Sequence, residues 1–102
     1  MELVDGQCRA LLPPLYTNEA LGYNATAPIK LFAPGTGWTW YPTEYDGDNL
    51  FFGMVAGLEV ELGYFSLTEL EGVRGAFGLP LEQDLYFTPT TLQELQRLHR
   101  GL

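Results

Sequence analysis

Three turn-forming segments divide the middle of the chain into short stretches that favour β-structure. These segments lie at 34–37, 46–49 and 57–58, where glycine, proline, aspartate and asparagine are concentrated. Such residues favour tight turns because glycine accepts positive φ and aspartate bonds to the nearby backbone. The stretches between them are rich in aromatic and β-branched residues, which fit a pleated and partly buried surface. We therefore expect four antiparallel strands joined as a meander, at 29–32, 38–45, 50–56 and 60–65.

Short helices are expected at both ends of the chain and after the last of these strands. Residues 3–12 repeat apolar side chains at helical spacing. Segments 66–69 and 91–94 each place a hydroxyl residue three positions before a glutamate, which is the spacing of a capping box. The first predicts a helix over 67–74. The second predicts a C-terminal helix with an apolar stripe of Leu92, Leu95 and Leu98. The predicted fold class is α+β, with a fifth strand if residues 84–87 also pair.

The second strand carries the densest aromatic pattern in the chain. Alternation along a strand places Trp38 and Trp40 on one face and Tyr41 and Tyr45 on the other. Pro42 removes one ladder donor, so it predicts either an edge position or a bulge late in this strand. Aromatic residues on both faces predict either a sheet covered on two sides or an exposed aromatic patch that binds a partner.

Length and composition indicate one domain spanning residues 1–102. Hydrophobic residues make up 46% of the chain and charged residues 18%, which is enough apolar surface to fold. No run of about 18 apolar residues is present, so we expect no membrane span. Residues 1–5 lack the positive start and apolar run of a secretion signal, and Cys8 has no second cysteine with which to pair. These features predict a cytoplasmic protein.

The chain is strongly acidic, and the imbalance is local. The formal net charge is −8, and residues 44–84 carry nine acidic side chains against Arg74 alone. Direct binding to nucleic-acid phosphates is therefore not expected, because such binding needs a basic surface. The acidic segment predicts either a solubilising face or a surface that meets a basic protein partner.

Several sequence blocks resemble a family of small bacterial proteins known as domain of unknown function 2958. They run through nearly the whole chain: Leu12-Pro13-Pro14-Leu15-Tyr16, Trp38-Thr39-Trp40-Tyr41, Glu44-Tyr45-Asp46-Gly47, Phe51-Phe52-Gly53, Gly63-Tyr64-Phe65-Ser66-Leu67 and Asp84-Leu85-Tyr86-Phe87. The resemblance implies no activity, cofactor or catalytic residue that can be assigned to these positions. Members of the family often occur on plasmids and phages, so it implies a role in element transfer or in blocking host defences.

The sequence offers residues for three kinds of chemistry. Cys8 and the single histidine, His99, could form a nucleophile and its base. The alternative interpretation is that His99 is a solvent-exposed residue at the end of a helix. Oxygen ligands at 44–49, chiefly Asp46 and Asp48, suit calcium or magnesium, although backbone-bonded turn residues explain the same pattern. Glu59 paired with Glu61 or Glu69 offers acid–base chemistry if burial separates their pKa values.

The pattern favours a non-enzymatic interaction module with an acidic, aromatic surface and no cofactor. The residues expected to contact a partner are Trp38, Trp40, Tyr41, Glu44, Tyr45, Asp46, Asp48, Glu59, Glu61 and Tyr64. A sharper form of this hypothesis is a mimic of nucleic acid that blocks a DNA- or RNA-binding enzyme. The alternatives are a small metal-dependent or carboxylate-based hydrolase centred on residues 46–61, and self-association through the aromatic surface.

Overall fold

A computed structural model describes residues 3–100 of the chain. Residues 1–2, on which part of the secretion-signal prediction rests, lie outside the described residues. The elements follow in the order α1 (Gly6–Arg9), the 3-10 helix η1 (Glu19–Asn24), β1 (Thr26–Ala27), β2 (Leu31–Phe32), β3 (Thr39–Tyr45), β4 (Leu50–Ala56), β5 (Val60–Ser66), α2 (Leu67–Gly72), the 3-10 turn η2 (Ala76–Gly78), β6 (Glu82–Gln83), β7 (Thr90–Thr91) and α3 (Leu92–His99).

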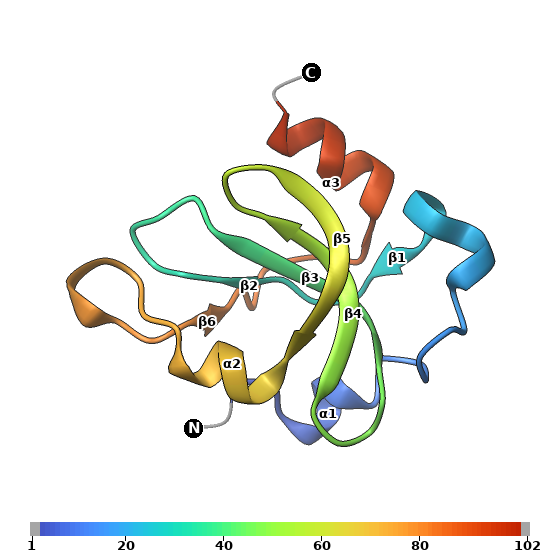
Figure 1. Cartoon of the computed structure of the whole chain (residues 1–102), viewed down its shortest axis with the longest axis horizontal. Coiled ribbons are helices and arrows are strands. Elements are labelled where there is room, and N and C mark those ends of the chain that lie inside the picture. The colour runs from blue at the N-terminus through green and yellow to red at the C-terminus, as the bar shows by residue number, and fades with distance from the viewer. Residues whose placement is uncertain (1–2, 101–102) are drawn as a thin grey trace.

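The main sheet is antiparallel and open, with strand order β5-β4-β3-β2-β6 (Figure 1). Strands β2 to β5 form the expected meander, and β1 pairs with β7 in a separate two-stranded ribbon. The α+β class is therefore confirmed. The fifth strand is Glu82–Gln83 rather than 84–87, because Asp84 starts a turn in which its side chain accepts the Tyr86 N–H at 2.9 Å.

Two capping boxes begin the helices that the sequence predicts. Ser66 Oγ accepts the Glu69 N–H at 3.0 Å, and Thr91 Oγ1 accepts the Glu94 N–H at 3.3 Å. The N-terminal helix is shorter than expected, since it starts only after the Asp5 cap and covers Gly6–Arg9. No helix within residues 3–100 is long and apolar enough to cross a membrane.

A bulge in β3 changes which side chains share a face. The pairing of β3 with β4 shifts between Pro42 and Glu44, where the proline predicts an irregularity. Trp40 and Tyr45 consequently pack in one hydrophobic core, while Tyr41 packs in a second core on the other side of the sheet. The expectation that Tyr41 and Tyr45 share a face is wrong, because the extra residue reverses the alternation.

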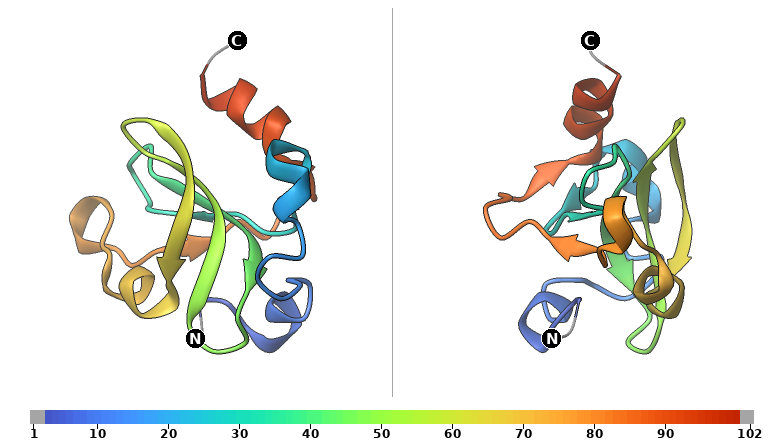
Figure 2. Two further views of the ribbon diagram at one scale, coloured as in Figure 1. Left: turned by 45° about the vertical axis from the view of Figure 1, so that its right-hand side comes forward. Right: turned by 90° about the vertical axis from the view of Figure 1, so that its left-hand side faces the viewer.

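The first core lies between the sheet and α1 and α2, and the second lies between the sheet and α3. The first contains Val4, Leu31, Phe51 and Phe65, with the Tyr45 and Phe51 rings stacked at a centroid distance of 4.7 Å. The second contains Met54 with Leu92 and Leu95 of α3, and Figure 2 shows α3 beside η1 and away from α1 and α2. Every position of β3 is buried, since this strand is central to the sheet.

The buried Glu44 carboxylate fixes the N-terminal segment to β3. Its Oε1 accepts the Tyr16 N–H at 2.9 Å and its Oε2 accepts the Asn18 N–H at 2.6 Å, while only 3% of the residue is exposed. The Tyr45 N–H donates to the Pro13 carbonyl at 2.9 Å beside it. Glu44 is therefore a structural residue, and its assignment to a partner surface does not fit its burial.

Replacing Glu44 with Gln should destabilise the protein. The amide presents one oxygen and one NH₂ group to two backbone donors, so one N–H loses its acceptor in a buried position, at a cost of about 2 kcal/mol. Urea unfolding measures the loss, with Glu71→Gln as a matched control on an exposed residue of α2. Equal unfolding midpoints for the two variants would show that the Glu44 contacts do not anchor this segment.

Candidate functional site

Trp38 stands at the end of a tight turn, with its indole partly open to solvent. Thr36 Oγ1 accepts the Trp38 N–H at 3.1 Å, and the Trp38 carbonyl accepts the Ala33 N–H at 3.0 Å. The indole stacks on Trp40 at a centroid distance of 6.0 Å. Trp38 is 41% exposed whereas Trp40 is 7% exposed, so only the first ring can contact a partner.

The indole of Trp38 lies directly against the bend between β4 and β5. A Cβ atom at Gly57 would come within 2.2 Å of the ring, so only glycine permits this contact. The next residue, Leu58, is 93% exposed. An aromatic ring and an aliphatic side chain therefore meet solvent together at the tip of the β4–β5 hairpin.

Two glutamates carry negative charge beside this ring. The register places Glu61 opposite Val55, which in turn lies opposite Trp40, so these three side chains share the face that Trp38 also occupies. Glu59 and Glu61 are both exposed. We call the group formed by Trp38, Leu58, Glu59 and Glu61 the hairpin surface.

A second group of carboxylates lies at the opposite end of β4. The Asn49 carbonyl accepts the Leu67 N–H at 2.8 Å, and the Asn49 side chain accepts the Thr68 N–H at 3.0 Å, which joins the β3–β4 turn to α2. We call the exposed carboxylates of these two segments the acidic end; they are Asp46, Asp48, Glu69 and Glu71. Seven-residue β4 separates them from the hairpin surface by roughly 20 Å.

Asp46 has a local structural role in this turn. Its Oδ1 accepts the backbone N–H groups of Asp48, Asn49 and Leu50 at 2.8, 2.9 and 3.0 Å. These hydrogen bonds, that of Leu50 above all, hold the pKa of Asp46 below its ordinary value. Within residues 3–100, no group of three or more His, Cys, Asp and Glu side chains is placed to hold a metal ion. The turn chemistry accounts for the aspartates that suggested calcium or magnesium.

Four of the residues expected to contact a partner are instead buried. Trp40, Tyr41, Glu44 and Tyr45 are between 2% and 7% exposed, because β3 is covered on both faces. Tyr64 is 53% exposed and packs edge-on against Phe52 at a centroid distance of 5.0 Å. Its side chain lies on the face of β5 opposite to Glu61. The predicted residues therefore divide into core residues, members of the hairpin surface, members of the acidic end, and Tyr64, whose side chain interacts with that of Tyr16.

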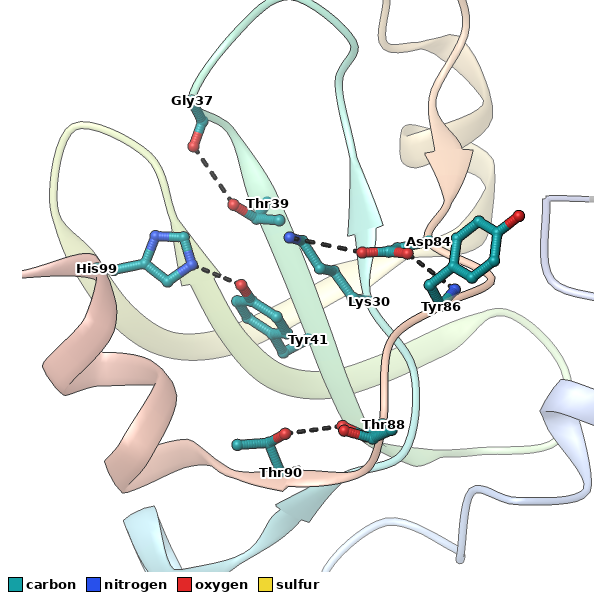
Figure 3. Close-up of polar contacts among 9 residues, drawn as sticks. All are labelled: Lys30, Gly37, Thr39, Tyr41, Asp84, Tyr86, Thr88, Thr90 and His99. Atoms are coloured by element: carbon teal, nitrogen blue, oxygen red, sulfur yellow. Dashed lines mark hydrogen bonds and ion pairs between the residues drawn. The ribbon is translucent and has the colours of Figure 1, made fainter.

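A polar cluster that the sequence did not reveal lies on the side of the sheet facing α3 (Figure 3). The Tyr41 hydroxyl lies 2.5 Å from His99 Nε2, and Lys30 Nζ lies 3.8 Å from Asp84 Oδ2. The ring of Tyr41 also contacts Phe87 at a centroid distance of 5.8 Å. The cluster thus ties the last turn of α3 to the central strand.

The surroundings of this cluster keep both partners of the Tyr41–His99 contact neutral. Desolvation raises the pKa of Tyr41 to about 12. Desolvation, followed by the positive charge of Lys30, lowers the pKa of His99. A neutral imidazole with an unprotonated Nε2 accepts a hydrogen bond from the Tyr41 hydroxyl, so this contact positions α3. Cys8 lies elsewhere, where Gln83 Nε2 donates to its sulfur at 3.0 Å and burial raises its thiol pKa, so no Cys8–His99 pair forms.

A groove of about 540 Å³ separates the hairpin tip from the end of α3. Residues 56–60 line one wall, including Glu59, and His99 and Arg100 line the other. In the part of the chain that the structure describes, Glu59 and Arg100 form no ion pair across it. The groove therefore adds a recess beside the hairpin surface.

Comparison with known proteins connects this architecture to one family. The family described as "Protein of unknown function (DUF2958)" matches residues 6–97. The chain belongs to the DUF2958 family. Searches of curated proteins and of solved structures give no match. In this DUF2958 protein the matched region includes β1 to β7, the hairpin surface and the acidic end.

The pH titration of His99 should follow from its position in the polar cluster. The chain contains a single histidine, so its NMR signals need no further assignment. We expect a pKa below 6.5 that rises in a Lys30→Gln variant, because desolvation and then the lysine charge lower it. The uncharged His99 ring then makes its full contribution to the free energy of unfolding above about pH 6.5. This contribution is lost as the pH falls through the lowered pKa of His99. A value at or above 6.5 in the unmodified protein would contradict this environment.

Proposed function

We propose that this protein is a non-enzymatic interaction module whose hairpin surface binds a basic protein partner. The observation that carries the proposal is the exposure of Trp38 beside two exposed carboxylates, with the exposed Leu58 at the tip of the same hairpin. Tryptophan is a typical anchor of protein interfaces, and carboxylates steer a partner of opposite charge. The proposed location is the cytoplasm.

The charge around this surface supports a basic partner. Between residues 31 and 96 the only lysine or arginine is Arg74, which lies in the loop after α2. The exposed charges of the β4–β5 hairpin and of the acidic end are therefore all negative. The field of such charges favours association with a lysine- or arginine-rich surface and opposes association with phosphates.

The geometry gives no support to the alternative of a hydrolase centred on residues 46–61. Shared acid–base or metal chemistry needs carboxylates that converge on one point. Here the acidic end and the hairpin surface lie at opposite ends of β4, and Asp46 Oδ1 accepts three backbone amides. The carboxylates are arranged to present charge over two separate areas.

A sharper form of the proposal is a mobile-element accessory protein that blocks host defence by imitating nucleic acid. The supporting observation is the acidic end, where the turn and α2 bring four exposed carboxylates onto adjoining segments. Spaced carboxylates can imitate backbone phosphates on the basic surface of a nuclease. An excess of this protein that leaves a panel of restriction enzymes and nucleases fully active would contradict this form.

Charge reversal on the hairpin tests the interaction directly. We expect a Glu59→Lys/Glu61→Lys variant to retain roughly tenfold less basic partner protein in affinity capture from the native cell, because like charges then face each other. An Asp48→Lys/Glu71→Lys variant makes the same change in net charge at the acidic end and is the matched control. Unchanged capture by the hairpin variant, or loss with the control variant only, would exclude the hairpin surface as the binding site.

A further inference from the structure

The two edges of the main sheet are built differently. At one edge, β6 has only two residues and is followed directly by the Asp84 turn. At the other edge, β5 has seven residues and contains neither proline nor lysine. Proteins usually protect sheet edges by shortening them or by placing proline or lysine there, because unpaired backbone groups attract further strands. The edge at β5 lacks these three protections.

Hydrogen bonds at both ends of the β4–β5 ladder show which backbone groups of β5 face outward. The Gly57 N–H donates to the Glu59 carbonyl at 3.0 Å, and the Leu67 N–H donates to the Asn49 carbonyl at 2.8 Å. The register between these pairs is regular. Antiparallel pairs alternate between bonded and non-bonded, so residues 61, 63 and 65 bond to β4. The N–H and C=O groups of Val60, Leu62 and Tyr64 must therefore point away from the sheet.

Nothing in the described part of the chain pairs with these outward groups. The sheet order ends at β5, and among residues 3–100 no backbone hydrogen bond reaches the N–H or C=O groups of Val60, Leu62 or Tyr64 from outside the β4–β5 ladder, although the side chain of Tyr64 interacts with that of Tyr16. In the right-hand view of Figure 2, β5 forms the outer boundary of the sheet. The edge is open over three consecutive outward positions, which suffices to align an added strand.

We propose that an extended, lysine- or arginine-containing segment of a partner protein adds to the sheet along β5. This inference rests on the proposed function and specifies its partner and mode of binding. An added strand places its side chains about 4.5–5.5 Å from those of β5. Glu61 lies on the face with Trp38, whereas Leu62 and Tyr64 lie on the other face. The segment that fits therefore alternates basic residues, facing the hairpin surface, with apolar residues on the opposite side.

A second copy of this chain is a poorer occupant of the same edge. Each chain carries a formal net charge of −8, and each would bring its own Glu59 and Glu61 to the shared edge. Like charges placed across neighbouring strands destabilise the pairing. A basic segment removes this repulsion and adds an attractive contact.

A proline at position 64 separates strand addition from other modes of binding. The Tyr64 N–H points outward, so Tyr64→Pro removes an edge donor and leaves the ladder to β4 intact. Tyr64→Ala removes the same ring and keeps the donor, which makes it the matched control. The probe is a ten-residue peptide of alternating lysine and valine, and a glutamate–valine peptide of equal length is the charge control.

We expect the lysine–valine peptide to bind the unmodified protein and Tyr64→Ala. Its affinity for Tyr64→Pro should be lower by a factor of about ten or more. In amide NMR spectra the peptide should shift Val60, Leu62 and Tyr64 more than Glu82 and Gln83. A peptide N-methylated at every residue keeps its side chains but cannot donate to the edge, so it should not bind. This last measurement holds even if Tyr64→Pro fails to fold.

The outcomes separate this inference from the proposed function. One outcome would overturn strand addition but keep the basic-partner function. In that outcome Glu59→Lys/Glu61→Lys abolishes binding, whereas Tyr64→Pro binds as well as Tyr64→Ala and the N-methylated peptide binds as well as the unmodified one. Equal binding of the glutamate–valine peptide overturns the basic partner. Light scattering that shows a dimer of the unmodified protein, and a monomer of Tyr64→Pro, assigns the edge to a second copy and also overturns the inference.

Discussion

The buried Glu44 carboxylate, together with the bulge beside it, is the interaction on which the arrangement of the sheet depends. The bulge turns Tyr45 toward the core that holds Trp40, and Glu44 uses both of its oxygens to hold the backbone at Tyr16 and Asn18. The N-terminal segment consequently covers the bulged end of β3. The edge at β5 has no further strand beside it among residues 3–100.

The sequence predicts the meander and the helix starts because their signals are local. Turn residues at 46–49 and the hydroxyl–glutamate pairs at 66–69 and 91–94 act through hydrogen bonds within a few residues. The exposure of each side chain on β3 could not be predicted in the same way. It depends on the bulge and on the distant segments that cover the strand, so the sequence does not show that Trp40, Tyr41, Glu44 and Tyr45 are buried.

The part that α3 contributes to the polar cluster has a sequence signal, the helical spacing of its sheet-facing residues, but that signal is ambiguous. In α3 the side chains that contact the sheet are the buried Leu92 and Leu95 and then the more exposed His99, at spacings of three and four residues, and Leu98 is 58% exposed. Periodicity allows either Leu98 or His99 to continue the stripe after Leu95. Only the position of Tyr41 on the neighbouring strand decides between them, since its hydroxyl needs a partner where it is buried. The shared face of Glu59 and Glu61 was easier to predict, because alternate residues lie on one face of any regular strand, whereas the exposure of Leu58 was not predicted.

Hydrogen exchange along β5 tests the central claim, an open edge beside the hairpin surface, most directly. The account predicts alternating protection in the isolated protein: slow exchange for the N–H groups of Glu61, Gly63 and Phe65, and fast exchange for those of Val60, Leu62 and Tyr64. Uniformly slow exchange along the whole strand at low protein concentration would show that the edge is already paired, and would contradict the account.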